Sequence, residues 1–128
     1  MIGMTAKAYD EFSADYDRFV NWDSRLGAEM PFIISKLDEH RSPSEGPLSI
    51  LDAACGTGMH AIALAEKGFQ AAGADESPGM IHRAVLNAKE ADVPVLFKTA
   101  GFTELEGAFR STDIFPFDAI LCLGNSLP

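Results

Sequence analysis

The chain carries short apolar runs separated by longer amphipathic stretches, a pattern typical of parallel strands connected by helices. The runs predict four strands, one that begins near Ile50 and ends at Asp52, and three over residues 69–74, 93–100 and 119–123. The run that Ile50 and Leu51 open leaves no room for a polar face, as expected of a parallel strand covered on both sides. With right-handed crossovers they predict an α/β fold, a doubly wound parallel sheet of strand order 3-2-1-4.

Helical periodicity marks the connections between these strands. Residues 59–67 and 78–91 have the spacing of helices that pack on a sheet, and Gly68 follows the first of them as its C-terminal stop. Ser77 and Pro78 supply the N-cap and the first-turn residue of the second. That helix is expected to bury an apolar face made of Met80, Ile81, Ala84, Val85 and Ala88.

Residues 1–40 predict a helical cap, which residues 41–47, rich in Ser, Pro and Gly, link to an α/β body at 48–128. Within the cap, a helix over 29–37 would have Pro31 in its first turn. Before it, aromatic residues three and four positions apart predict a helix with one aromatic face, made of Tyr9, Phe12, Tyr16 and Phe19. That face either packs on the core or lines a binding site, and the sequence alone leaves both open.

A glycine-rich turn follows the first strand. Gly56, Gly58 and Ala61 form a G-x-G-x-x-A pattern, in which the glycines allow close backbone approaches and the alanine lets the next helix pack on the strand. Free N–H groups at the start of that helix favour a negatively charged ligand group. Because nicotinamide-binding and flavin-binding folds share this pattern, it does not by itself name the ligand.

Two acidic residues narrow the choice of ligand. A buried Asp52 just ahead of the turn would lie poorly beside a pyrophosphate, because two anions would share a low-dielectric site. It suits a ligand that carries both a carboxylate and a cation, such as S-adenosylmethionine. Asp75 ends the second strand about twenty residues past the first glycine, where an acid accepts hydrogen bonds from ribose hydroxyls.

Two stretches carry a resemblance to a known family. Residues 51–58, Leu-Asp-Ala-Ala-Cys-Gly-Thr-Gly, resemble the first motif of class I S-adenosylmethionine-dependent methyltransferases, which have a Rossmann-like fold. Residues 117–128 resemble the fourth motif of small-molecule N-methyltransferases, and their Cys-Leu-Gly-Asn-Ser string is similar to the glycine and sarcosine methyltransferase branch. The resemblance implies in-line transfer of the cofactor's methyl group to a small acceptor, expected to be an amine, with alignment supplying much of the acceleration.

The resemblance also assigns residues to roles. The cofactor would be bound by residues of the glycine turn, of the end of the second strand and helix start, and of the loops after strands three and four: Asp52, Ala54, Cys55, Gly56, Thr57, Gly58, Asp75, Glu76, Met80, Gly101, Phe102 and Leu123. Asn125 and Tyr16 are expected at the reacting methyl group, and Trp22, Arg25 and Asn125 in acceptor binding. Gly101 departs from the acidic or amide residue that the family often has there, although the aromatic residue after it can still stack on the adenine ring.

Composition narrows the class of partner. The net charge of −9 leaves no basic patch for a nucleic acid, and no apolar run is long enough to span a bilayer. The acidic N-terminus does not resemble a signal peptide, so a cytoplasmic location is expected. Cys55 and Cys122 are expected to be buried, reduced thiols, and no metal site is expected.

The chain reaches only a fourth strand, whereas complete members of this family continue with three more, which implies an N-terminal portion of such an enzyme. The fourth strand would then be an exposed sheet edge, able to pair with a second copy. Two other functions stay open. A nicotinamide-dependent reductase domain disagrees with Asp52 and with Gly-Asn-Ser at 124–126. A binding or interaction module without catalysis would keep the fold and lose the reaction.

Overall fold

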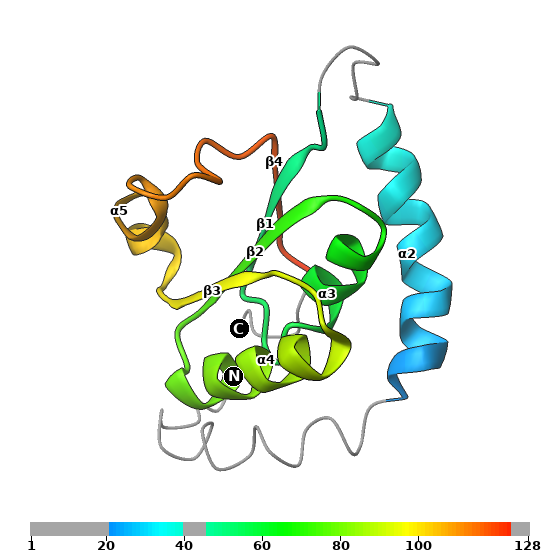
Figure 1. Ribbon diagram of the computed structural model, residues 1–128, viewed down its shortest axis with the longest axis horizontal. Helices are drawn as coiled ribbons and strands as arrows, with labels where there is room; N and C mark the ends of the chain where they lie inside the picture. Colours follow the sequence, from blue (N-terminus) through cyan, green and yellow to red (C-terminus); the bar gives the residue numbers. More distant parts are fainter. Residues whose placement is uncertain (1–20, 40–45, 124–128) are drawn as a thin grey trace.

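The computed structural model describes residues 21–39 and 46–123 (Figure 1). Its four strands pair in parallel and form one sheet of order β3-β2-β1-β4, as predicted. The strands are β1 (Ser49–Ala53), β2 (Gln70–Asp75), β3 (Leu96–Thr99) and β4 (Ala119–Leu121).

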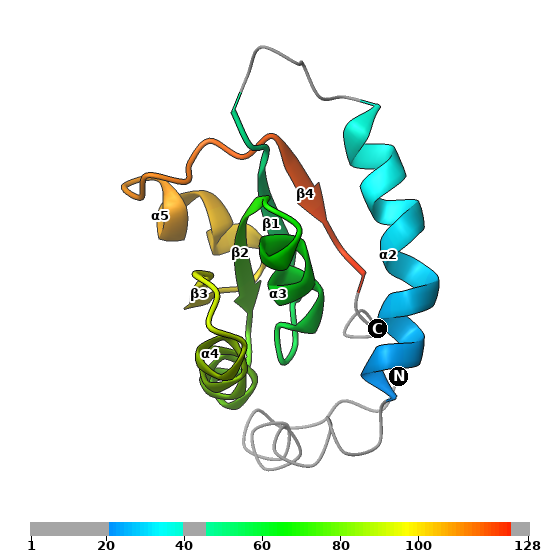
Figure 2. The same cartoon turned by 45° about the vertical axis from the view of Figure 1, so that its right-hand side comes forward.

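Helices connect successive strands. They are α3 (Met59–Glu66), α4 (Pro78–Ala91), and a 3-10 turn (Phe102–Glu104) followed by α5 (Leu105–Phe109), while α2 (Trp22–Asp38) precedes β1. Along the chain, β2 pairs with one side of β1 and β3 pairs with β2, and β4 then pairs with the other side of β1. Right-handed crossovers therefore place α3 and α4 on one face and α5 on the other. Figure 2 shows the sheet between α5 and α3, with α2 packed outside α3.

The two faces of the sheet bury different side chains. Toward α2 and α3, one apolar cluster contains Met30, Ile33, Leu37, Leu48, Ile50, Ala61, Leu64, Phe69 and Ala71. Toward α5, a second contains Leu51, Ala72, Ala74, Ala100 and Phe109. Since side chains alternate along a strand, Ile50 and Asp52 point to the first face and Leu51 to the second. The Asp52 carboxyl therefore lies on the face that α3 covers.

The helix α2 begins earlier than the sequence pattern predicts. The predicted helix covered 29–37 with Pro31 in its first turn, whereas the observed helix starts at Trp22 and has Pro31 in its interior. Asn21 explains the start, because its side-chain oxygen accepts a hydrogen bond from the Ser24 N–H at 3.1 Å. A proline inside a helix costs about 3 kcal/mol. Burial of Met30, Ile33 and Leu37, on the face of α2 that packs on α3, offsets that cost.

The predicted ends of the next two helices are confirmed. Ser77 Oγ accepts a hydrogen bond from the Met80 N–H at 3.1 Å, and Pro78 is the first residue of α4. Gly68 follows α3 with a φ of 94°, the left-handed conformation that commonly ends helices. Both signals are local, so the sequence could place them.

The outer strands are shorter than predicted. β3 begins at Leu96 instead of Val93, because Pro94 has no N–H to give to a ladder. Among the described strands, β4 pairs with β1 alone and is a sheet edge. Ile120 on this edge is 60% exposed, and Cys122 is exposed, so the prediction of a buried Cys122 is wrong. An edge strand has a neighbouring strand on one side only, so residues at the edge are less protected from solvent. Pairing of this edge with a second copy stays a prediction.

Candidate functional site

Residues 54–58, the glycine loop, connect the carboxyl end of β1 to α3. Ala54, Gly56 and Gly58 have positive φ angles of 60°, 57° and 83°. Backbone hydrogen bonds hold this shape, because Cys55 N–H donates to a β2 carbonyl at 2.8 Å and Gly58 N–H donates to Cys55 O at 3.0 Å. A residue with a side chain, such as Ala54, costs about 1–3 kcal/mol in this conformation, and such residues cluster at functional sites.

Asp75 holds the glycine loop from the end of β2. The residue is 5% exposed, and its Oδ2 accepts a hydrogen bond from Gly56 N–H at 2.9 Å while Oδ1 accepts one from Ser77 N–H at 3.0 Å. The carboxylate thus ties the loop to the N-cap of α4. Each oxygen keeps a second lone pair, so the predicted bonds to ribose hydroxyls stay a prediction that the geometry allows. The sequence pattern indicates Asp75 as a ribose-binding residue, but it does not predict that Asp75 also fixes the glycine loop.

Asp52 is the most unusual group of the site. It is 2% exposed, and its Oδ1 has no hydrogen-bond partner among the described residues. Burial, followed by the nearby charge of Asp75, raises the pKa of Asp52 to about 7. A buried carboxyl beside a second one resists ionisation, and a cation placed near it would favour the charged form. Among the described residues, no positive charge offsets these two effects on Asp52.

The helix α4 holds the glycine loop from the other side through Asn87. The Asn87 Nδ2 donates a hydrogen bond to Thr57 O at 3.0 Å, and Met59 Sδ lies 3.6 Å from the same nitrogen. Thr57 is 1% exposed, and the predicted cofactor residue Met80 is also buried. The sequence analysis missed Asn87. Its signal was a single amide within the buried stripe of α4, where a polar side chain needs a partner.

The loops after β2 and β3 bring Glu76 and Gly101 together. A methyl carbon placed on Gly101 would lie 3.6 Å from Glu76 Cγ. The Glu104 carboxylate accepts the Gly101 N–H at 3.0 Å, an interaction that the sequence analysis missed. Phe102 follows with 49% of its surface exposed. This end of the site therefore offers an aromatic ring that solvent reaches.

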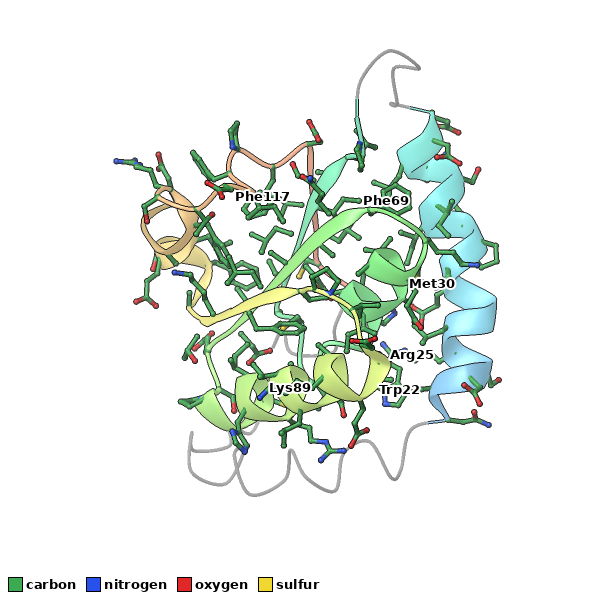
Figure 3. The ribbon with its side chains drawn as sticks, in the orientation of Figure 1. Trp22, Arg25, Met30, Phe69, Lys89 and Phe117 are labelled. Carbon is green, nitrogen blue, oxygen red and sulfur yellow. The ribbon has the colours of Figure 1, made fainter. Side chains whose placement is uncertain are left out.

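Trp22 and Arg25 extend from α2 toward α3 (Figure 3). Arg25 Nε donates to Glu29 Oε1 at 2.7 Å, and the guanidinium carbon lies 5.1 Å from the centre of the Trp22 ring. The Trp22 ring meets His60 edge-on, with ring centres 5.8 Å apart. Burial lowers the pKa of His60, which the Glu29 carboxylate 3.4 Å away opposes. This cluster attaches α2 to the helix that follows the glycine loop.

Some predicted roles have no counterpart in these contacts. The acceptor-binding role of Trp22 and Arg25 stays a prediction. Tyr16 and Asn125 lie outside the described residues. Leu123 is half-buried and packs on the apolar cluster toward α2 and α3, so its place beside the cofactor also stays a prediction.

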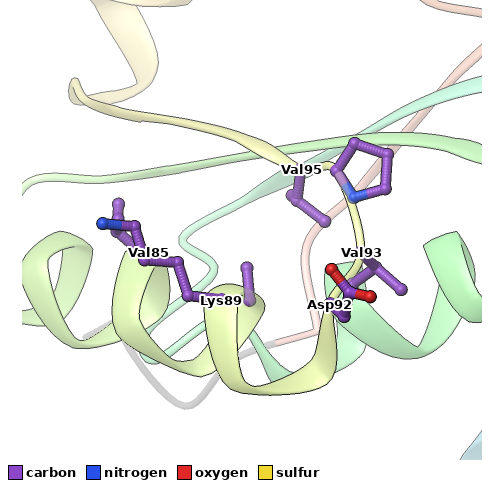
Figure 4. Close-up of a pocket in the computed structure, with 7 residues that line it drawn as sticks. Val85, Lys89, Asp92, Val93 and Val95 are labelled. Atoms are coloured by element: carbon purple, nitrogen blue, oxygen red, sulfur yellow. The ribbon is translucent and has the colours of Figure 1, made fainter.

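A hollow of about 520 Å³ lies away from the glycine loop, between the C-terminal half of α4 and the segment before β3 (Figure 4). It is lined by Val85, Ala88, Lys89, Asp92, Val93, Pro94 and Val95, none of which is a predicted site residue. Val85 is 38% exposed, so its predicted place on the core face of α4 is wrong. The smaller Ala84 and Ala88 let α4 approach the sheet closely and leave Val85 at the rim.

Two other features are absent from the part of the chain that the structure describes. Residues 21–39 and 46–123 contain no group of three His, Cys, Asp or Glu side chains that could hold a metal ion. Their helices are also too short or too polar to cross a membrane.

A family model assigns the chain to its class. The model, described as a methyltransferase domain, matches residues 50–128, which include β1 from Ile50 onward, the glycine loop, Asp52 and Asp75. The chain belongs to this methyltransferase family. The match covers more than half of the 128 residues and includes β2, β3, β4 and all of β1 except Ser49.

Curated relatives of this methyltransferase domain include N-methyltransferases. The chain is 42% identical over 118 residues to the glycine/sarcosine N-methyltransferase of Parasynechococcus marenigrum (strain WH8102), covering 91% of this chain and 38% of that protein. It is 35% identical over 123 residues to the glycine/sarcosine N-methyltransferase of Halorhodospira halochloris, covering 95% of this chain and 42% of that protein. The chain thus spans less than half the length of the curated relatives that it matches.

A solved methyltransferase has the same fold. The magnesium protoporphyrin IX methyltransferase of Synechocystis PCC 6803, solved with bound SAM, superposes with a TM-score of 0.64 and 24% identity. The superposition covers 98% of this chain and 64% of that one. Together with the strand order, this likeness confirms the predicted Rossmann-like sheet with flanking helices.

Proposed function

We propose that this methyltransferase domain binds S-adenosylmethionine at the glycine loop and serves the transfer of its methyl group to a small-molecule amine. The observation that carries the proposal is the buried carboxyl of Asp52 beside a helix N-terminus, whose Oδ1 has no hydrogen-bond partner within residues 21–39 and 46–123. Such a site pairs a place for an anion with a place for a cation. S-adenosylmethionine carries a carboxylate and an ammonium on one carbon, close to a sulfonium, and so fits both.

The first turn of α3 suits the carboxylate of the ligand. Gly58 is the N-cap of α3 and makes no side-chain hydrogen bond to it. The first intrahelical bond of α3 runs from Ile62 N–H to Gly58 O at 2.9 Å, so the N–H groups before Ile62 precede the helical ladder. A negative group at such an end gains about 0.3–1 kcal/mol from the helix dipole.

Asp52 suits the ammonium of the ligand. An ammonium would give Oδ1 the donor that it lacks and would favour the ionised carboxylate. A pyrophosphate would instead bring negative charge to two buried carboxyls, which is unfavourable. This difference supports S-adenosylmethionine over a nicotinamide cofactor.

The nucleoside would lie along the ends of β2 and β3. Asp75 would accept hydrogen bonds from the ribose hydroxyls with its remaining lone pairs. Glu76 and Gly101, which lie side by side, would flank the adenine. The exposed ring of Phe102 would stack on it. The remaining predicted cofactor residues, Ala54, Cys55, Thr57, Met80 and Leu123, would shape the cavity around these contacts.

The residues of this chain would act by binding and alignment. When bound, S-adenosylmethionine supplies an electrophilic methyl group on a positively charged sulfur. Alignment of two reactants lowers a barrier by up to about 7–11 kcal/mol without an acid or base. We place Asn125 and Tyr16 at the methyl group, where an amide or phenol oxygen would accept a hydrogen bond from the amine. Trp22 and Arg25 would orient the rest of the acceptor.

The relatives support an amine as the acceptor, because two that match over most of this chain are named glycine/sarcosine N-methyltransferases. The net charge of −9 supports a small acceptor over a nucleic acid, which would need a basic surface.

Isothermal titration of the chain with S-adenosylhomocysteine, beside NADH, tests the cofactor. S-adenosylhomocysteine keeps the carboxylate, ammonium and nucleoside of the proposed ligand, so it should bind while NADH should not. Binding of NADH alone would identify a nicotinamide site. Binding of neither would overturn the proposal for this chain and favour a module that retains the fold without the cofactor.

A further inference from the structure

Phe97 lies in one row with Asp52 across the sheet. The strand registers pair Asp52 with Gly73 and Gly73 with Phe97. Paired residues of parallel strands share a face, so all three belong to the face that α3 and α4 cover. Gly73 has no side chain, and the Phe97 ring fills the space above it. A methyl carbon on Gly73 would lie 2.7 Å from Phe97 Cδ1 and Cε1, far inside van der Waals contact.

The same ring reaches the glycine loop. A methyl carbon on Gly58 would lie 2.6 Å from Phe97 Cζ and 2.9 Å from Ala84 Cβ. The Cys55 sulfur closes the other side, because it would lie 2.9 Å from a methyl carbon on Gly73. The ring therefore sits between β2, the glycine loop and α4. Two glycines on different elements leave space for one aromatic side chain.

We propose that Phe97 is a positioning residue, whose ring supports the glycine loop from beneath and so sets the affinity for the cofactor. The proposal rests on the function proposed above. The Gly56 N–H donates to Asp75 and the Asn87 amide donates to Thr57 O, and neither hydrogen bond acts on the underside of Gly58. Ala54 holds a strained positive φ angle in this loop, so the loop is expected to relax when a cavity opens below Gly58.

Phe97→Leu tests the proposal, with Phe109→Leu as the matched control. Phe109 is fully buried, lies on the opposite face of the sheet and belongs to the other apolar cluster. Both variants lose the same ring atoms, from a half-buried site at Phe97 and from a fully buried site at Phe109. We expect Phe97→Leu to weaken binding of S-adenosylhomocysteine about tenfold or more, and Phe109→Leu to leave the affinity of the folded protein within about twofold. Equal losses in both variants would overturn the proposal.

Hydrogen exchange of loop amides gives a second readout that needs no ligand. The amides of Cys55, Gly56 and Gly58 are hydrogen-bonded within the loop or to β2, and they report directly on its shape. In Phe97→Leu they should exchange about tenfold faster than in the wild type, whereas Phe109→Leu should leave them unchanged. Unchanged loop exchange in Phe97→Leu would overturn the proposal. If the wild type binds no S-adenosylhomocysteine, the cofactor assignment fails, and the exchange result still decides the role of Phe97.

Gly73→Ala tests the same contact with the Phe97 ring by a substitution in β2. The added methyl group would displace the ring without removing it, so it should also accelerate exchange at Gly58. The double variant Gly73→Ala with Phe97→Leu should recover part of the lost affinity and protection, because the smaller side chain makes room. Effects that simply add would contradict a shared contact. If Phe97→Leu fails to fold, Gly73→Ala alone serves as the test, and unchanged exchange at Gly58 in that variant would overturn the proposal.

Discussion

The two faces of the sheet differ in chemistry, although adjacent residues of β1 contribute side chains to both. Leu51 points toward α5 and joins a cluster of apolar and aromatic side chains, in which Phe109 and Phe117 meet edge-on with ring centres 5.4 Å apart. Asp52 points to the other face as a buried carboxyl, and its Oδ1 has no hydrogen-bond partner in the part of the chain that the structure describes. Both faces bury apolar clusters that stabilise the fold, but the face toward α3 also carries a buried carboxyl whose ionisation costs stability.

The largest expected effect is a loss of stability on the face of the sheet toward α5. Phe109→Ala should lower the free energy of unfolding by about 3–5 kcal/mol, because it empties a fully buried aromatic site. Urea denaturation measures this loss. The folded fraction should still bind S-adenosylhomocysteine with the affinity of the wild type. A large loss of affinity would show that the two faces are not separate.

The second-largest expected effect is a gain of stability when Asp52, on the face toward α3, is replaced. In the folded protein the pKa of Asp52 is about 7, above that of an unfolded carboxyl, so the folded state binds the extra proton. Stability from this group is therefore lost as the pH rises from about 4 to about 7. Asp52→Asn removes the titration and should be more stable than the wild type at pH 8 by about 2–4 kcal/mol.

Urea denaturation of both proteins between pH 4 and pH 8 checks this. The difference between Asp52→Asn and the wild type should grow with pH and level off above 7. A difference that shows no trend with pH would mean that the buried carboxyl does not carry the proton.

The third effect is a loss of affinity on substitution of Asp75, compared with substitution of another carboxylate that also accepts backbone N–H groups. Asp75→Ala should weaken binding of S-adenosylhomocysteine by about 1.5–3 kcal/mol, since it removes a charged acceptor and releases Gly56. Asp118 is the control, because its Oδ2 accepts the Ser49 N–H at 2.7 Å at the start of β1, away from the loop. Calorimetry of Asp118→Ala should show no change of affinity. Similar losses in both variants would indicate a general loss of structure.

The smallest expected effect concerns Asn87. Asn87→Ala leaves the Thr57 carbonyl without its amide donor and should weaken binding by about 0.5–1.5 kcal/mol. Asn21→Ala removes the cap of α2 and should reduce stability alone. If Asn87→Ala reduces stability without touching affinity, the amide belongs to the scaffold and not to the site.

Local signals account for most of what the sequence could predict. The order of the strands follows from short apolar runs and crossover handedness, and the glycine turn, the Ser77 cap and the Gly68 stop follow from residue type at fixed offsets. The carboxyls Asp52 and Asp75 could be found because each sits at a strand end beside the turn. Nothing in these signals depends on distant residues.

What escaped prediction depends on contacts between distant elements. The start of α2 was wrong because packing of its apolar face outweighs the proline in its interior. Asn87 reaches Thr57 across 30 positions of the sequence. Phe97 was read only as part of a strand, since its role depends on glycines in two other elements. Such partners are set by the tertiary fold, which no local pattern contains.

The central claim is that Asp52 receives the cation of the cofactor. The most direct test is calorimetric titration of S-adenosylhomocysteine into wild type and Asp52→Asn at pH 8. The account predicts binding by the wild type and an affinity about tenfold to hundredfold weaker in Asp52→Asn, even though that variant is the more stable protein. Equal affinity in the two proteins would contradict it.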